Sequence, residues 1–183
     1  GLRPLTSGQV EIAGKDMTHW TPGQRTAAAL GYIPEERMRD GIVQEFSVAE
    51  NMMLDGHTRP PYSNGFFLNF GAIASTTRRL VKDFAIRTPS IDTPTRSLSG
   101  GNIQKIILAR ELSRDPSVLV AAQPTRGVDI GATEYIHQRL LDQRTRGAAT
   151  LLISEDLDEV LALSDRIAVL YEGRVMAVLP RAE

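Results

Sequence analysis

Apolar residues recur along this chain with two different periods, and the change of period separates its middle from its two ends. Val10 and Ile12 alternate with polar residues between turn residues, which predicts a short strand with one polar face. A second short apolar run, from Ala27 to Ile33, stops at Pro34. From about Gly41 to Arg96 the pattern predicts helices and loops without a convincing strand.

Two helices are expected in this middle part. Ser47 followed by Glu50 forms a capping box, which predicts a helix over SVAENMML. Residues 56–70 are rich in Gly, Pro, Ser and Asn, and they predict a loop. The second helix follows this loop and has apolar residues at helical spacing, namely Ile73, Leu80, Val81 and Phe84.

The C-terminal half contains two continuous apolar runs, VLVAA at 118–122 and ATLLIS at 149–154. Such runs are typical of strands that are buried on both faces. A helix from about Gly101 precedes the first run, and a second helix, with its apolar side between Ala132 and Leu140, separates the two. A short helix, DLDEVLAL, and two strands around the turn at Glu172-Gly173 follow. This order predicts an α/β fold with a parallel sheet and right-handed crossovers.

Composition narrows the class of protein. The 183 residues suffice for one domain with an inserted lobe, and 42% hydrophobic with 23% charged residues is ordinary for a globular chain. A net charge of −1 argues against nucleic-acid binding, which requires a basic face. The absence of cysteine excludes disulfides and thiolate metal sites. His19, His57 and His137 lack metal-ligand spacing, and we interpret them as surface or packing residues.

The chain carries no sequence signal for membrane insertion or export. No apolar run approaches the length of a membrane span, and the N-terminus does not resemble a signal peptide. The first residue is Gly1 rather than a methionine, and we expect the chain to be part of a longer protein.

Residues 97–105, SLSGGNIQK, are the main candidate for a binding site. Ser99 is predicted to cap the following helix, and Gly100 and Gly101 let a ligand approach the backbone closely. Because a helix N-terminus favours negative charge, the turn suits a phosphate. The alternative is a plain glycine-rich helix start that binds no ligand, because these residues alone fit both. The phosphate-loop pattern G-x-x-x-x-G-K-[ST] is absent from the chain. A phosphate bound at this turn would therefore need the rest of its pocket from elsewhere.

The segment after the first buried strand strengthens the functional interpretation. QPTRGVDIGA places Asp129 in a turn directly after VLVAA. That turn lies at the carboxyl edge of the predicted sheet, where open α/β sheets bind their ligands.

Taken together, three stretches resemble an ATP-binding cassette (ABC) transporter ATPase. LSGGNIQK, VLVAAQPTRGVDIGA and LLISEDLDEV are similar, in order and spacing, to the family's signature motif, Walker B strand with D-loop, and switch region. SGQVEIAGKDM and GYIPEER…SVAENMML resemble the segments before and after the Q-loop. The forms LSGGN-x-QK and PTRGVD-x-GA further resemble the second cassette of tandem sugar and nucleoside importers.

The resemblance covers essentially the whole chain and implies its fold. It implies a P-loop NTPase (RecA-like) parallel-sheet core with an inserted helical subdomain, truncated before the Walker A helix and so lacking the Walker A segment. Residues 1–40 would be the N-terminal β segment and Q-loop, and 41–96 the helical subdomain. Residues 97–183 would be the core with the signature motif, a degenerate Walker B strand, the D-loop and the switch region.

The resemblance also implies a ligand and partners. Ser99, Gly100 and Gly101 would contact the γ-phosphate of an ATP held by a second cassette, with Gln104 nearby, and Asp129 would link the two sites. The implied cofactors are ATP and Mg²⁺, held mainly by that partner. Membrane permease subunits and, indirectly, a periplasmic or lipoprotein solute-binding protein would complete an importer, with the cassette peripheral on the cytoplasmic face of the membrane. No nucleic-acid partner is expected.

Four positions depart from the hydrolytic pattern of the family. The Walker B aspartate falls at Ala122, the catalytic glutamate at Gln123, the Q-loop glutamine at Glu35 and the switch histidine at Glu155. Alanine cannot ligate Mg²⁺, and a neutral amide cannot accept a proton as a carboxylate does. We therefore expect this cassette's own site to hydrolyse ATP weakly.

Several alternatives stay open at this point. Phe66, Phe67 and Phe70 are interpreted as a small core of the helical part, and a contact with a membrane subunit is the alternative. EERMRD, residues 35–40, is interpreted as a charged turn in solvent. For the protein itself the alternatives are an ATPase active at its own site, a soluble ABC ATPase outside transport, and a regulatory cassette that never binds nucleotide.

Overall fold

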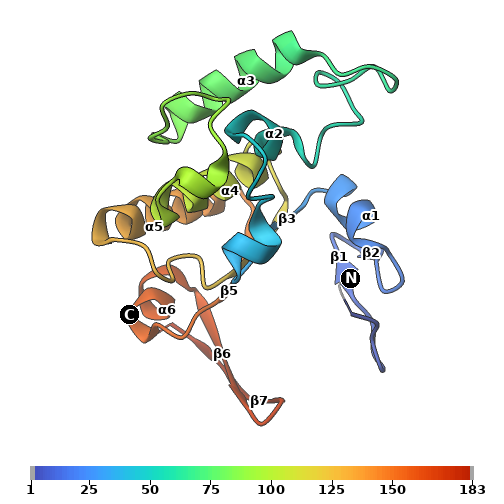
Figure 1. Cartoon of the computed structure of the whole chain (residues 1–183). Helices are drawn as coiled ribbons and strands as arrows, with labels where there is room; N and C mark the ends of the chain where they lie inside the picture. Colours follow the sequence, from blue (N-terminus) through green and yellow to red (C-terminus); the bar gives the residue numbers. More distant parts are fainter. Residues whose placement is uncertain (1–2, 182–183) are drawn as a thin grey trace.

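The computed structural model describes residues 3–181 and is centred on a three-stranded parallel sheet (Figure 1). Its strands are β3 (Leu30–Ile33), β4 (Val118–Ala122) and β5 (Ala149–Ile153), in the order β3-β4-β5. The predicted α/β class and parallel sheet are confirmed. Since all three strands run in the same direction, their carboxyl ends meet at one edge of the sheet.

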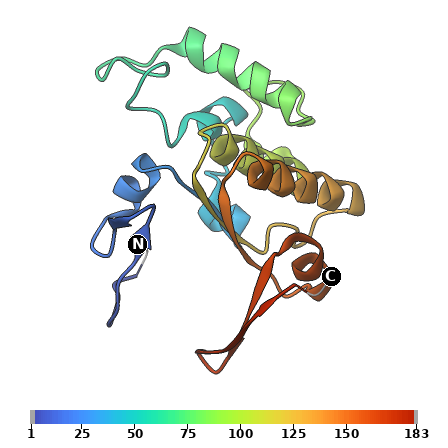
Figure 2. The ribbon, with the colours of Figure 1, turned by 180° about the vertical axis from the view of Figure 1, so that it is seen from behind.

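Two long helices pack against this sheet and against each other (Figure 2). They are α4 (Gly100–Leu112) and α5 (Ile130–Thr145), and both agree with the predicted helices. α4 is buried around most of its circumference, because the sheet, α5 and the helical lobe enclose it. The main core forms where α4 meets the sheet and α5, with side chains such as Ile103, Ile107, Leu119 and Ile136.

The prediction that β5 is buried on both faces is wrong. Leu151 and Ile153 are 57% and 49% exposed, and Leu152 alone in the strand is partly buried against the core. Among the described residues β5 pairs with β4 on one side only. An apolar run therefore marks a strand that the described residues leave half uncovered.

The middle of the chain forms a helical lobe beside α4, as predicted. It contains α2 (Val48–Met53), α3 (Phe70–Asp83) and the short η2 (Thr95–Ser97). The capping box is confirmed, since Ser47 Oγ accepts from Glu50 N at 3.2 Å and Glu50 Oε2 accepts from Ser47 N at 2.8 Å. Leu80 and Phe84 bury the apolar face of α3.

The phenylalanine cluster lies on the surface of this lobe, so the prediction of a small core there is wrong. Phe66, Phe67 and Phe70 are 93%, 77% and 72% exposed. Asn64 Oδ1 accepts from the backbone N–H groups of Phe66 and Phe67, at 3.1 and 2.9 Å, and so fixes the turn that carries both rings. The turn is ordered by its backbone while its aromatic side chains face outward.

A group of buried and half-buried charges, here called the α4 charge cluster, attaches the end of α4 to the lobe and the sheet. It consists of Asp55, Arg110, Glu111 and Arg114. Arg110 Nε lies 3.0 Å from Glu111 Oε1 and 3.2 Å from Asp55 Oδ2, and Glu111 Oε2 accepts from Tyr32 N at 3.2 Å. Burial raises the pKa of Glu111 even though Arg110 opposes that shift.

The two ends of the chain form small antiparallel units. At the N-terminal end β1 (Glu11–Ile12) pairs with β2 (Lys15–Asp16), and α1 (Pro22–Ala27) leads into β3. At the other end α6 (Leu157–Leu163) precedes the hairpin of β6 (Arg166–Tyr171) and β7 (Arg174–Pro180), which forms a sheet of its own. η1 (Arg37–Gly41) is a single π-helical turn after β3. Within residues 3–181 no helix is both long and apolar enough to cross a membrane.

Candidate functional site

The turn at the start of α4 is built as the sequence predicts. Ser99 is the N-cap, with φ −66° and ψ 153°, and it is exposed. Asn102 Nδ2 donates to Ser99 Oγ at 2.9 Å, and Asn102 Oδ1 accepts from Arg87 N at 2.7 Å. Because the first N–H groups of a helix have no intrahelical acceptor, those of Gly100 and Gly101 are available at this end. An anion can therefore meet backbone donors and a fixed hydroxyl at the same place.

Both glycines lie close to neighbouring segments, and the approach is tightest at Gly100. A Cβ atom on Gly100 would lie 2.8 Å from Arg37 Nη2. On Gly101 it would lie 3.5 Å from Ala132 Cβ and 3.7 Å from Asp129 Oδ2. The turn at α4 is thus in contact with the η1 turn on one side and with the start of α5 on the other.

Asp129 is the N-cap of α5, and its Oδ1 atom accepts from Ala132 N at 2.9 Å. Its other oxygen faces Gly101. The tertiary structure therefore brings Ser99, Gly100, Gly101 and Asp129 together, although thirty residues separate the first from the last.

Arg37 holds this arrangement from the side, and sequence reasoning missed it. Its guanidinium donates to the backbone oxygens of Arg126 and Gly127, in the segment that leads to Asp129, while it packs against Gly100. Glu35 forms an ion pair with Arg126 and joins the same two segments. No pattern in EERMRD distinguishes Arg37 from Arg39, which pairs with the adjacent Asp40 in solvent. The interpretation of this stretch as a plain solvated turn is therefore wrong for Arg37.

Gln104 is placed differently from the prediction. It is 1% exposed on the buried side of α4, so its amide does not reach the surface that Ser99 and the two glycines form. α4 turns a residue five positions from its N-cap into the core, where the lobe and sheet enclose it. Asn102 contacts Ser99 instead. The stretch NIQK contains two side-chain amides, Asn102 and Gln104, and sequence alone offers no signal for choosing between them.

Three of the four departing positions gather at the carboxyl ends of β4 and β5. Ala122 ends β4 and pairs in register with Ile153. Gln123 follows with φ +49°, donates its N–H to Ile153 O at 2.7 Å, and accepts from Glu155 N through Oε1 at 3.4 Å. The fourth, Glu35, follows the end of β3 and is held by Arg126. This sheet edge thus presents a methyl group and a neutral amide where Mg²⁺ binding and proton abstraction would need carboxylates.

No group of three or more His, Asp or Glu side chains is arranged to hold a metal ion within the part of the chain that the structure describes. The side chains at the sheet edge fit a Mg²⁺ ion poorly for the same reason, since Ala122 offers no ligand atom. The donors at Ser99, Gly100 and Gly101 fit a phosphate group.

A parallel sheet with a helical lobe inserted after its first strand, and a glycine turn lying beside the aspartate that caps the next helix, define an ATP-binding cassette. The chain belongs to the ABC transporter family, whose family model matches residues 1–126.

Curated relatives match nearly the whole chain. It is 44% identical over 177 residues to the guanosine import ATP-binding protein NupO of Bacillus subtilis, which covers 97% of this chain and 35% of that protein. It is 45% identical over 179 residues to the nucleoside import ATP-binding protein NupA of Lactococcus lactis, with 98% and 35% covered. The glucose import ATP-binding protein TsgD13 of Haloferax volcanii is 43% identical over 178 residues. The chain spans about a third of the length of these relatives.

Solved structures share the fold. The ATP-binding cassette MJ0796, in a dimeric post-hydrolysis state bound to ADP and Pi, superimposes with a TM-score of 0.82 at 19% identity. The match covers all of this chain and 77% of that one. A nucleotide-free cassette from an ABC transporter gives a TM-score of 0.76 at 22% identity, with 73% of its chain covered.

Proposed function

We propose that this chain is an ATP-binding half of an ABC importer for nucleosides or sugars, acting as the second cassette of a tandem. Its signature turn would complete an ATP site whose phosphate loop belongs to another cassette, while its own site is degenerate. The observation that carries this proposal is a contrast between two surfaces. The exposed Ser99 and the half-buried Gly100 and Gly101 form a turn with unpaired donors that Asn102 supports, whereas Ala122 and Gln123 leave the sheet edge without carboxylates at their positions.

The role of the turn follows from its chemistry. Backbone N–H groups and the Ser99 hydroxyl would donate to the γ-phosphate of an ATP presented by the partner cassette. Asp129 would lie at the interface beside them. Bound Mg²⁺ neutralises phosphate charge in such a site, and its ligands would come mainly from the partner. Closure around ATP would move the helical lobe, because α4 carries the turn at one end and contacts the lobe along its length.

Two of the relatives named above are nucleoside importers by name, and one is a glucose importer. The proposed solute of this importer is therefore a nucleoside or a sugar, and the two nucleoside relatives favour a nucleoside. The relatives' names also support an importer over a soluble ATPase of another pathway. Permease subunits would then be the membrane partners, and a solute-binding protein would act through them. This would place the cassette at the inner surface of the membrane as a peripheral subunit.

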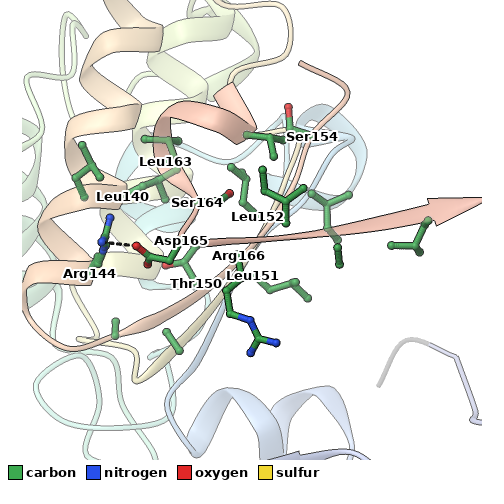
Figure 3. Close-up of a pocket in the computed structure, with 18 residues that line it drawn as sticks. Leu140, Arg144, Thr150, Leu151, Leu152, Ser154, Leu163, Ser164, Asp165 and Arg166 are labelled. Atoms are coloured by element: carbon green, nitrogen blue, oxygen red, sulfur yellow. Dashed lines mark ion pairs between the residues drawn. The ribbon is translucent and has the colours of Figure 1, made fainter. Parts of the chain in front are cut away.

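A cleft beside β5 supports the further proposal that the missing phosphate-loop strand belongs to the same cassette. The cleft measures about 870 Å³ and lies between β5 and β6, with Leu151, Leu152 and Leu163 among its lining residues (Figure 3). Arg144 and Asp165 form an ion pair beside it. A parallel strand added to the outer edge of β5 would pair with its backbone and cover its exposed side chains. The unmatched quarter of the solved cassettes is long enough to include such a strand.

The exposed phenylalanines support a contact between the lobe and a permease. Replacing Phe66 and Phe67 together with serine should weaken association of the cassette with its permease by roughly tenfold or more, because aromatic anchors dominate such interfaces. Co-purification in detergent would measure this. Tyr171→Ser, at an exposed aromatic position on the C-terminal hairpin, is the matched control. Equal retention of both variants would rule out the contact.

The direct test of the degenerate site is to restore it. Ala122→Asp combined with Gln123→Glu, made in the assembled importer, should leave the rate of transport essentially unchanged, because the productive ATP site contains the phosphate loop of the other cassette. The reverse change, from glutamate to glutamine, made at the catalytic glutamate of that other cassette should stop transport. Transport that rises severalfold after restoration would show that this chain's own site limits the reaction, and would favour an ATPase that is active at its own site.

A further inference from the structure

A buried carboxylate connects the D-loop with the switch segment. Glu159 lies in the first turn of α6 and is 2% exposed. Its Oε1 atom accepts a hydrogen bond from Thr125 Oγ1 at 2.9 Å and lies 2.9 Å from His137 Nε2. Its Oε2 atom is buried and has no hydrogen-bond partner among the residues that the structure describes. Sequence reasoning treated His137 as an ordinary packing residue and gave Glu159 no role.

The three side chains come from three separate segments of the candidate site. Thr125 stands two residues after Gln123, in the loop whose next two carbonyls accept from Arg37. Glu159 stands four residues after Glu155, whose N–H donates to Gln123. His137 lies on α5, the helix that Asp129 caps. One carboxylate oxygen therefore holds the loop after β4, the switch helix α6 and α5 at fixed distances.

The chemistry of the group favours a positioning role. Because the carboxylate accepts only, Thr125 and His137 must both donate to it, which fixes the direction of the hydroxyl and places the proton of His137 on Nε2. A buried carboxylate oxygen without a donor is unfavourable, and such groups in native structures call for an explanation. The unpaired Oε2 atom leaves Glu159 able to accept one more donor if the D-loop or the switch segment moves.

We propose that Glu159, held by Thr125 and His137, is a positioning residue that transmits movement between the D-loop and the switch segment when the cassette closes on its partner. The proposal rests on the proposed function, because it assumes a partner cassette. In this proposal Asp129 contacts the partner cassette, and Glu155 lies at the carboxyl edge of the sheet, where a nucleotide would bind. The Thr125–Glu159 hydrogen bond makes the loop that leads to Asp129 and the helix that follows Glu155 move together. His137 anchors the carboxylate to the body of α5.

The test compares Thr125→Val with Thr125→Ser in the assembled importer. Valine has nearly the same shape as threonine but cannot donate to Glu159, whereas serine keeps the hydroxyl. Thr125→Val should lower the kcat for ATP hydrolysis and the amount of solute moved per ATP by roughly tenfold, with the KM for ATP nearly unchanged. Thr125→Ser should restore both quantities. Glu159→Met, which fills similar space but removes both acceptor oxygens, should resemble Thr125→Val, and the double variant should be no worse than either single one.

These readouts separate positioning from simple support of the fold. A purely structural role would lower the amount of assembled protein and would leave solute moved per ATP unchanged in the protein that assembles. That result would overturn the proposal, as would equal impairment of the valine and serine variants. If Glu159→Met does not assemble, the two Thr125 variants decide alone, since they leave the buried carboxylate in place. Failure of the proposed function is recognised separately, by normal transport in a Ser99→Arg importer.

Discussion

Replacing Ser99 with arginine in the assembled importer is expected to reduce transport and ATP hydrolysis by roughly a hundredfold or more. The serine hydroxyl lies at the exposed N-terminus of α4, beside the free N–H groups of Gly100 and Gly101. An arginine side chain there would fill the space that a γ-phosphate needs and would remove the donor that Asn102 holds in place. Loss of one preorganised donor at a developing charge alone costs about this much.

Transport assays in vesicles and ATPase assays on the purified assembly measure this effect. Ser75→Arg introduces the same side chain at an exposed position on α3, and it should leave both rates near those of the unmodified importer. Binding of ATP by the partner cassette should persist in the Ser99 variant, because in the proposed function that cassette supplies the phosphate loop. Near-normal transport after Ser99→Arg would refute the role of the turn in trans.

Arg110→Met is expected to destabilise the cassette by about 3–5 kcal/mol, which is the usual cost of breaking a buried ion pair on one side. Arg110 is 7% exposed and lies between Asp55 and Glu111 in the α4 charge cluster. Methionine would fill most of the space but would leave Glu111 buried beside only the more distant Arg114. Urea unfolding of the purified chain measures the change in the free energy of unfolding.

The sign of the pH dependence provides a second check on this variant. Burial raises the pKa of Glu111 above its usual value of 4.5. The folded state therefore binds this proton more tightly than the unfolded state, and stability falls as the pH rises from about 4.5 through the folded pKa. Loss of Arg110 should raise that pKa further, so the destabilisation should be larger at pH 8 than at pH 5.

Arg79→Met removes an exposed pair with Asp83 and should change stability by only about 0.3–0.5 kcal/mol at either pH. Equal effects of the two substitutions would contradict the importance of the cluster.

Much of the local structure could be predicted from the sequence because it depends on neighbouring residues. The capping box of Ser47 and Glu50 and the N-cap at Ser99 are contacts between residues three positions apart, which the chain order fixes. The apolar spacing of α3 and the strand–helix–strand order of the C-terminal half likewise depend on periods that any reader of the sequence can count. The motifs that resemble an ABC ATPase also identified the residues of the turn and the departures at Ala122 and Gln123.

Exposure and long-range contacts could not be predicted in this way. The apolar run of β5 is ambiguous, because a run of this kind fits a covered strand and equally a strand beside an unfilled cleft. The aromatic residues in the Phe66–Phe70 stretch could be placed in a core or on the surface with the same local sequence.

The sequence by itself determined the fold class, the order of the elements, and which residues form the glycine turn at Ser99, the turn at Asp129 and the sheet edge at Ala122 and Gln123. Only the tertiary structure decided which side chains support them: Asn102 rather than Gln104 beside Ser99, Arg37 against Gly100, and Glu159 between Thr125 and His137. The reason is physical. Each of the last two contacts joins residues twenty or more positions apart, and their distance in space depends on how helices and strands pack rather than on any period along the chain.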